Sequence, residues 1–190
     1  MKIGCIIMAS GLGKRFGSNK LLQEFGGKTL LQRILESTTN LFDKRVVVTR
    51  SEEVNQFCRE NKVEVIFHDL PNRNQAVKLG IEQMKNMDGC MFCPCDQPFL
   101  KRESMERLKI SFEYKKSGIH RLVYEDHEGS PVLFGKEYFR ELQELPLKSG
   151  GSYLVGKYPA KVEKIEAACR EELLDIDTKE DLEKLKMYIK

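Results

Sequence analysis

Short apolar runs of the kind that form β-strands alternate along this chain with longer stretches whose apolar residues recur at helical spacing. The strand-like runs are residues 3–8, 45–49, 63–67, 90–93 and 162–165. The helix-like stretches are residues 29–40, the segment around Val54 and Cys58, residues 74–87, residues 102–116 and a last one that begins at Thr178. This alternation predicts an α/β fold, with a doubly wound, mainly parallel open sheet and helices on both of its faces.

A polar turn interrupts the regular alternation. The turn EDHEGS, residues 125–130, separates the runs 119–124 and 131–134, and this pattern predicts a small antiparallel insertion in the sheet. Near the end of the chain a short apolar run at 173–176 leads to Thr178. Asp181 follows with the spacing of a capping box, which predicts that the last helix begins there.

Length and charge narrow the class of protein. A chain of 190 residues is long enough for one well-buried domain and short for two, so we predict a single domain over residues 1–190. The net charge of +3 argues against a dedicated nucleic-acid binder. No segment approaches the roughly 20 apolar residues of a membrane span, and the first apolar run is too short for a signal peptide. We therefore expect a cytoplasmic protein that binds neither nucleic acid nor membrane.

The cysteines indicate free thiols. They are Cys5, Cys58, Cys90, Cys93, Cys95 and Cys169. The trio at 90, 93 and 95 is clustered, but a structural zinc site would need a second pair of ligands at suitable spacing, and none follows. We expect buried strand cysteines in a reducing compartment. A redox or metal-trafficking protein that uses this trio is the alternative.

The first apolar run leads directly into a glycine-rich basic loop, MASGLGKRFGSNK, at residues 8–20. Its glycines and cations are Gly11, Gly13, Gly17, Lys14, Arg15 and Lys20. Glycines let backbone N–H groups wrap around a phosphate chain. Arg15 would donate bidentate hydrogen bonds to the phosphate oxygens, and Lys20 would add a positive point charge. We interpret the loop as a triphosphate cradle; a solvated turn with chance basic residues is the alternative.

Two better-known phosphate loops are excluded. The spacing from Gly11 to Gly17 is one residue too long for G-x-G-x-x-G. The acidic residue expected directly after the second strand is also missing, since Val48 is followed by Thr49 and Arg50. The GKT at 27–29 lacks the first glycine of a P-loop and has no strand of its own before it.

Carboxylates at the ends of the apolar runs are candidates for a metal site. Asp96 lies in PCDQP, directly after the run 90–93, where ligands bind in parallel sheets. We predict that Asp96 binds Mg²⁺, which prefers one or two carboxylates together with substrate oxygens, and that Asp177 is a second ligand. Each has an alternative role as a helix cap, Asp96 for 102–116 and Asp177 for the last helix.

The histidines and Lys148 do not indicate a specific catalytic or metal-binding role. His68, His120 and His127 match no metal spacing, so we expect surface or polar-core roles for them. Lys148 either holds an anionic acceptor or is a solvated charge, and both interpretations stay open.

Five segments together resemble one superfamily. MASGLGKRFGSNKLL resembles the opening signature of the nucleotidyltransferases, and within them the chain is similar to the molybdenum cofactor cytidylyltransferase family, of MobA/MocA type. The other matching segments follow in order: FGGKTLLQR (25–33), CDQPFL (95–100), GSPVLFGKEYFREL (129–142) and DIDTKEDL (175–182). The chain departs from the family pattern at 72–80, where Ala76 replaces a serine, and at 147–152, where the acceptor would bind.

The resemblance implies a Rossmann-like domain of the nucleotide-diphospho-sugar transferase, or GT-A-like, type. It implies an enzyme that uses Mg²⁺ or Mn²⁺ to transfer a nucleotide from an NTP, CTP before GTP, to a phosphorylated small molecule. That acceptor is expected to be the molybdenum cofactor, with a molybdoenzyme as client. The residues carried over are catalytic Arg15, Lys20 and Asp96, metal-binding Asp96 and Asp177, and nucleotide-binding Met8, Ala9, Ser10, Gly11, Leu12, Gly13, Arg15 and Lys20.

The resemblance also places Ser10 in the nucleobase pocket. Guanylyl-transferring relatives tend to have glycine there and cytidylyl-transferring ones alanine, so a serine is expected to narrow the pocket against a purine. We therefore predict CTP as donor. GTP, a sugar or polyol phosphate as acceptor, and a nucleotide-binding protein without catalysis are the alternatives.

Overall fold

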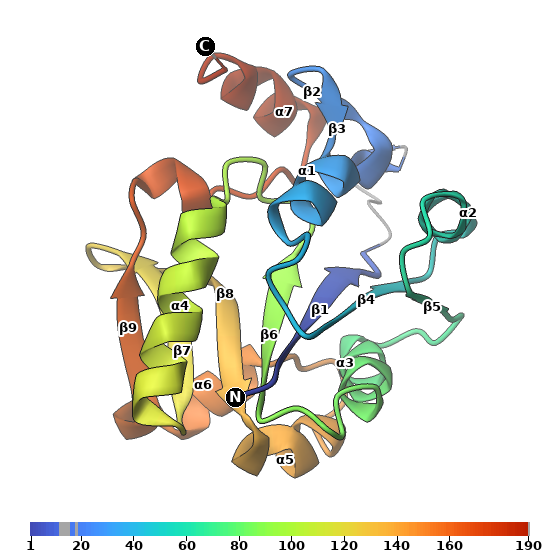
Figure 1. The fold of residues 1–190 in the computed structure, drawn as a ribbon. Coiled ribbons are helices and arrows are strands. Elements are labelled where there is room, and N and C mark those ends of the chain that lie inside the picture. Colours follow the sequence, from blue (N-terminus) through green and yellow to red (C-terminus); the bar gives the residue numbers. More distant parts are fainter. Residues whose placement is uncertain (12–15, 18, 190) are drawn as a thin grey trace.

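The computed structural model describes residues 1–11, 16–17 and 19–189, and over these residues the chain forms a seven-stranded sheet (Figure 1). The strands, in spatial order, are β5 (Val65–Phe67), β4 (Lys44–Thr49), β1 (Ile3–Ala9), β6 (Gly89–Pro94), β8 (His127–Gly135), β7 (Ile119–Tyr124) and β9 (Val162–Glu166). The pairs β5–β4, β4–β1, β1–β6 and β7–β9 are parallel, whereas β8 is antiparallel to both of its neighbours. The predicted mainly parallel sheet with an antiparallel insertion is confirmed.

Helices cover both faces of the sheet. On one face lie α1 (Leu30–Ser37), α2 (Glu52–Glu60) and α4 (Arg102–Lys115), and on the other lie α3 (Arg73–Glu82), α5 (Phe139–Gln143) and α6 (Ser152–Lys157). Successive side chains of a strand point to opposite faces, so β1 contributes to two separate cores. Ile7 packs in the core of α1, α2 and α4, whereas Ile6 packs with Val77 of α3 and Leu142 of α5.

A third, smaller core lies beyond the end of the sheet. There the two-stranded hairpin of β2 (Glu24–Phe25) and β3 (Lys28–Thr29) packs against the last helix, α7 (Lys179–Lys186) (Figure 1). The residues buried in it are Phe16, Phe25, Leu30, Ile176, Leu182 and Leu185. Lys28 and Thr29 of the GKT segment form the return strand of this hairpin, and Thr29 caps α1 by accepting a hydrogen bond from the backbone N–H of Gln32.

Several predicted boundaries differ from the structure. Helix α1 ends at Ser37 and α3 at Glu82, short of the predicted 40 and 87, although Met84 and Met87 are still buried in the turn that follows α3. The apolar run 173–176 forms no strand, and its Ile176 is buried in the third core. The capping box of Thr178 and Asp181 is confirmed. No helix in the described part of the chain is long and apolar enough to cross a membrane.

Candidate active site at the carboxyl edge of the sheet

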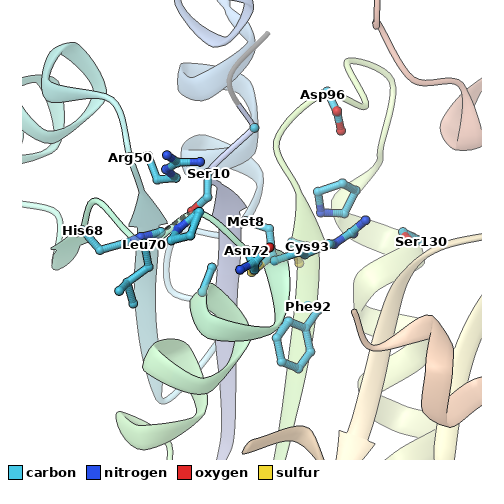
Figure 2. Close-up of a pocket in the computed structure, with 15 residues that line it drawn as sticks. Met8, Ser10, Arg50, His68, Leu70, Asn72, Phe92, Cys93, Asp96 and Ser130 are labelled. Carbon is cyan, nitrogen blue, oxygen red and sulfur yellow. Dashed lines mark hydrogen bonds between the residues drawn. The ribbon is translucent and has the colours of Figure 1, made fainter. Parts of the chain in front are cut away.

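A cavity of about 490 Å³ lies where the parallel strands end, and its strand wall comes from alternate residues (Figure 2). The even-numbered side chains of this wall are Met8 on β1 and Ser10 after it, Arg50 after β4, His68 after β5, Phe92 and Pro94 on β6 and Asp96 after it, and Ser130 on β8. Because the side-chain period of a strand is two, these positions share the sheet face that α3 covers. Gly11 and Cys93 complete this wall.

The opposite wall is the beginning of α3. Asn72, Arg73 and Ala76 line the cavity there, and Asn72 forms a capping box with Gln75. The loop that leads to α6 packs against Arg73 so closely that a Cβ at Gly150 would lie 2.8 Å from the Arg73 Nε. The two segments that depart from the family pattern, 72–80 and 147–152, therefore lie together beside the cavity.

Ser10 and His68 form a hydrogen-bonded pair within the cavity wall. The Ser10 hydroxyl donates to the carbonyl oxygen of Val48 at 3.0 Å, and the His68 Nε2 lies 2.9 Å from the same hydroxyl oxygen. With the hydroxyl proton directed at Val48, Nε2 is the donor to Ser10. Burial, and then the charge of Arg50, lower the pKa of His68, so the ring is neutral at pH 7.

His68 is a residue that sequence reasoning missed, since a surface or polar-core role was expected. A signal existed, because His68 follows a strand and has the same parity as Ile66, which packs with the α3 core. The expectation is confirmed for His120, which is buried and bonded to Ser111 and Ser117. His127 is exposed.

A cluster of one cation and two carboxylates lies at the Asp96 end of the cavity. The Lys20 Nζ donates to Asp96 Oδ2 at 2.7 Å, to the Ile176 carbonyl oxygen at 2.9 Å and to Asp177 Oδ1 at 3.1 Å. The exposed fractions of the Lys20, Asp96 and Asp177 side chains are 9%, 28% and 44%. Burial opposes the charge on Lys20, but its attraction to and hydrogen bonds with the two carboxylates outweigh burial and raise its pKa.

Neither carboxylate serves as the cap that the alternative interpretation assigned to it. Helix α4 begins after Lys101 without a side-chain cap, so the capping role for Asp96 is wrong. The side chain that caps α7 is Thr178, while Asp177 pairs with Lys20.

The charges of Asp96 and Asp177 also act on Asp175, a residue that was not anticipated. Although its side chain reaches solvent, the surrounding protein desolvates it, and the charges of Asp96 and Asp177 add repulsion. Together they raise the pKa of Asp175 to about 6, against the opposing effects of a hydrogen bond from Gln97 and the charge of Lys20.

The other residues predicted to bind the nucleotide do not all lie at the cavity. Met8, Ser10 and Gly11 line the cavity, whereas Ala9 is buried in the core on the opposite face. Leu12, Gly13 and Arg15 lie outside the described residues, so their roles stay predictions. Lys148 is exposed, with a positive φ of 65°.

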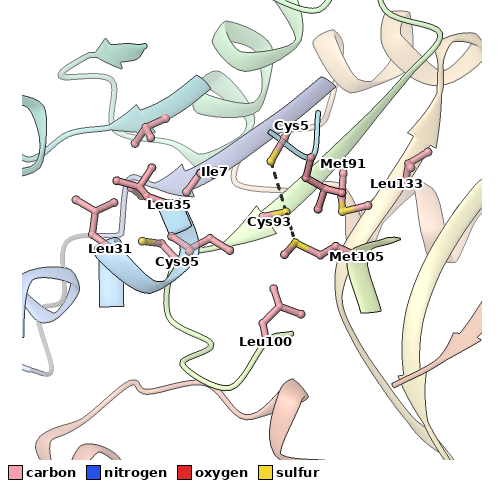
Figure 3. Packing of buried hydrophobic residues seen from close by; sticks show 14 of the residues in the cluster. Cys5, Ile7, Leu31, Leu35, Met91, Cys93, Cys95, Leu100, Met105 and Leu133 are labelled. Atoms are coloured by element: carbon pink, nitrogen blue, oxygen red, sulfur yellow. Dashed lines mark hydrogen bonds between the residues drawn. The ribbon is translucent and has the colours of Figure 1, made fainter. Parts of the chain in front are cut away.

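The cysteine trio is divided between two cores: Cys93 and Cys95 pack in the core of α1, α2 and α4 (Figure 3), and Cys90 packs in the core of α3, α5 and α6. All three thiols are buried, and the Cys93 Sγ lies 3.6 Å from Cys5 Sγ and 3.8 Å from Met105 Sδ. Burial contributes to raising the pKa of each thiol well above its ordinary value. Within the described ranges, no three His, Cys, Asp or Glu side chains gather as a metal-binding group. The prediction of buried free cysteines is confirmed.

Residues 5–162 match the family model of the MobA-like NTP transferase domain. The chain belongs to this family. The matched part of this MobA-like transferase includes most of β1 and the loop that carries Asp96. A curated relative from Aquifex aeolicus, described as a probable molybdenum cofactor guanylyltransferase, is 24% identical and covers 95% of this chain and 89% of its own length. Further relatives of that description are matched over about half of their length.

Solved structures show the same fold for this MobA-like transferase. Rv0371c from Mycobacterium tuberculosis matches with a TM-score of 0.86 at 22% identity, over 98% of this chain and 99% of that one. A complex of Rv0371c with manganese matches with a TM-score of 0.77 at 18% identity, over the same shares. CMP:2-keto-3-deoxy-manno-octonic acid synthetase complexed with CTP matches with a TM-score of 0.80 at 14% identity, over 100% of this chain and 98% of that one. The shared architecture is the GT-A-like fold of nucleotidyltransferases.

Proposed function

We propose that this MobA-like nucleotidyltransferase moves CMP from CTP to the phosphate group of a small-molecule acceptor and releases pyrophosphate. The observation that carries the proposal is the cavity. The Ser10 hydroxyl, held by its hydrogen bonds to Val48 and His68, lines one end of it, and the Asp96 carboxylate lines the other. A nucleotide can then lie with its base at Ser10 and its phosphates toward Asp96. Residues 1–190 are taken as one catalytic domain.

The acceptor needs little activation. The second pKa of a phosphate monoester is near 6, so its oxygen is largely ionised at neutral pH and can attack the α-phosphorus without a general base. The P–O bond to the pyrophosphate breaks as the new phosphoanhydride forms. What the protein must supply is alignment of the two substrates and neutralisation of charge.

The carboxylate cluster fits a hard divalent cation. Asp96 and Asp177 offer oxygen donors held near one another by Lys20, and both side chains are partly exposed beside the cavity. Mg²⁺ or Mn²⁺ uses few protein carboxylates and completes its shell with phosphate oxygens and waters. When bound by Asp96 and Asp177, the cation would neutralise charge on the triphosphate and the leaving pyrophosphate. The manganese complex of Rv0371c, a protein with the same fold, supports the use of a divalent cation.

The Ser10 side chain supports a pyrimidine as base. Its hydroxyl is fixed between Val48 and His68, so it cannot rotate aside to admit a larger ring without breaking both contacts. A steric filter of this kind typically contributes about 1–3 kcal/mol, so we expect a preference for CTP and not an absolute exclusion of GTP. GTP is the second candidate, because several curated relatives are described as guanylyltransferases.

The acceptor site is proposed beside Arg73 and the 147–152 loop, where positive charge would suit a phosphorylated molecule. We propose the molybdenum cofactor as acceptor and a molybdoenzyme as client, as the descriptions of the relatives support. A sugar or polyol phosphate is the alternative.

The test is a matrix of the four NTPs against molybdopterin, molybdenum cofactor and sugar or polyol phosphates, with Mg²⁺ or Mn²⁺, measured as pyrophosphate release. We expect release to require both an NTP and an acceptor and to be fastest with CTP. Asp96→Asn keeps the side-chain size but removes the charge, so it is the matched inactive control, and its circular dichroism should be unchanged. Tight NTP binding without pyrophosphate from any combination would instead establish a non-catalytic nucleotide-binding protein.

A further inference from the structure

The two protein partners of the Ser10 hydroxyl leave it a single way to bond a ligand. A carbonyl oxygen can only accept, so the one hydroxyl proton is directed at Val48 and the His68 Nε2 donates to the hydroxyl oxygen. This holds for the neutral ring with its proton on Nε2 and for the charged ring, in which both nitrogens carry a proton. Of the two lone pairs of the hydroxyl oxygen, one therefore remains.

Backbone contacts between the strand ends hold this pair in place. The His68 N–H donates to the Thr49 carbonyl oxygen at 3.1 Å, and the Thr49 hydroxyl donates to the Ala9 carbonyl oxygen at 3.1 Å. Thr49 is fully buried and His68 is 9% exposed. The ends of β1, β4 and β5 are thus joined beside Ser10, so the hydroxyl is oriented before any ligand binds.

Toward the cavity, Ser10 is an acceptor (Figure 2). Cytosine carries an amino donor at C4, whereas uracil, like thymine, carries a carbonyl acceptor at the same position. The amino group can donate to the remaining lone pair of Ser10. The uracil oxygen would meet another acceptor, and turning the hydroxyl proton toward it would set the oxygen of Ser10 against the Val48 carbonyl. Either arrangement leaves desolvated polar atoms unpaired, which is costly.

The neighbouring cation does not make this distinction. Arg50 lines the same wall, and its guanidinium has donors only. Such donors suit the C2 carbonyl oxygen, which cytosine and uracil share. The choice between the two pyrimidines therefore depends on Ser10.

We propose that Ser10, held by Val48 and His68, accepts a hydrogen bond from the exocyclic amino group of the base, so that the cavity selects cytosine over uracil. This rests on the proposed function, which places the base at Ser10. It adds to the steric filter, which acts against purines and cannot separate two pyrimidines of equal size. His68 is a positioning residue here, because it acts through the Ser10 hydroxyl.

The test measures binding of CTP, UTP and dCTP to the full chain by isothermal titration calorimetry at equal Mg²⁺. The wild-type chain is expected to bind CTP about 10- to 100-fold more tightly than UTP, the loss typical of an unpaired, desolvated polar group. The triphosphate of 2-pyrimidinone riboside has hydrogen in place of the amino group and should bind with an affinity between the two. Equal affinities for CTP and UTP would overturn the proposal, and a weakened dCTP in that case would place the ribose at Ser10.

Two substitutions separate the acceptor from its support. Ser10→Ala removes the acceptor, so the affinities for CTP and UTP should come within about threefold of one another. His68→Leu removes one of the two bonds that hold the hydroxyl, which can then take another rotamer and donate; the ratio should fall about tenfold. An unchanged ratio in Ser10→Ala would refute the role of the hydroxyl.

The conservative variant distinguishes positioning from a role in folding alone. His68→Gln keeps an N–H that can donate to Ser10, so it should retain most of the preference for CTP over UTP and serves if His68→Leu does not fold. Equal loss of the ratio in the glutamine and leucine variants would exclude a positioning role for His68. His127→Leu removes an exposed histidine of β8 outside the cavity, and this matched control should keep the wild-type ratio.

Failure of the inference can be told from failure of the proposed function. A wild-type chain that binds CTP more tightly than UTP but releases no pyrophosphate with any acceptor would sink the proposed function and leave the recognition of the amino group standing. A chain that releases pyrophosphate with equal kcat/KM for CTP and UTP would sink the inference and leave nucleotidyl transfer standing.

Discussion

Ser10 is the residue whose chemistry bears most directly on the choice of substrate. Ser10→Gly removes both the bulk at the cavity wall and the hydroxyl that bonds Val48 and His68. We expect the ratio of kcat/KM for CTP over GTP to fall about tenfold in this variant, in line with a steric filter of modest strength. Ser10→Ala removes the hydroxyl alone and should keep most of the preference. A wild-type protein that binds GTP more tightly than CTP at equal Mg²⁺ would refute the cytidylyl assignment.

At the residue scale, the site residues that could be predicted from the sequence are those directly after a strand. Ser10 and Asp96 could be predicted to be at the carboxyl edge because each follows an apolar run, and parallel strands end together. The contacts between Lys20 and residues 176 and 177 could not be predicted, since they join segments at the two ends of the chain. No spacing pattern encodes such a contact, because it depends on where α7 packs.

At the scale of elements, the capping box of α7 is the local feature that sets where the Asp177 segment ends. Thr178→Ala removes the side-chain acceptor for the backbone N–H of Asp181. We expect a loss of about 1 kcal/mol in the free energy of unfolding, measured by urea denaturation. Thr178→Ser keeps the hydroxyl and should stay close to wild type. Equal stability of the alanine and serine variants would show that packing of Leu182 and Leu185 alone fixes the helix.

The elements that sequence reasoning found were those with a clear period. The longer strands and α4 repeat their apolar residues often enough to be recognised, and the polar turn at 125–130 marked the β7–β8 hairpin. The β2–β3 hairpin was missed because two-residue strands have no period to detect. The run at 173–176 was apolar for another reason, since Ile176 packs under α7 and bonds to the Asp96 loop.

For the whole molecule, the raised pKa of Asp175 predicts how stability depends on pH. The folded chain holds this proton up to a pH of about 6, whereas the unfolded chain releases it near 3.8. The folded state therefore binds more protons in that interval, and stability falls as pH rises through it. Asp175→Asn should raise Tm at pH 7.5 by a few degrees, for a gain of about 1 kcal/mol after allowance for solvent exposure.

The matched measurement for this variant is the same thermal melt at pH 4. There the wild-type Asp175 is largely protonated when folded, so the advantage of asparagine should shrink. A constant difference in Tm at both pH values would show that the gain comes from another source, such as a stronger hydrogen bond with Gln97.

Along the strands, even-numbered and odd-numbered residues form two sets with different roles, and the two sets can vary separately. Even-numbered side chains near the ends of β1, β4 and β6 line the cavity, while their odd-numbered neighbours pack in the core of α1, α2 and α4. Substitutions at the first set can retune specificity at little risk to folding. A one-residue insertion within β1 would exchange the two sets and lose both at once. Lineages of this architecture should therefore diversify by substitution in the strands and by insertion only in the loops beyond them.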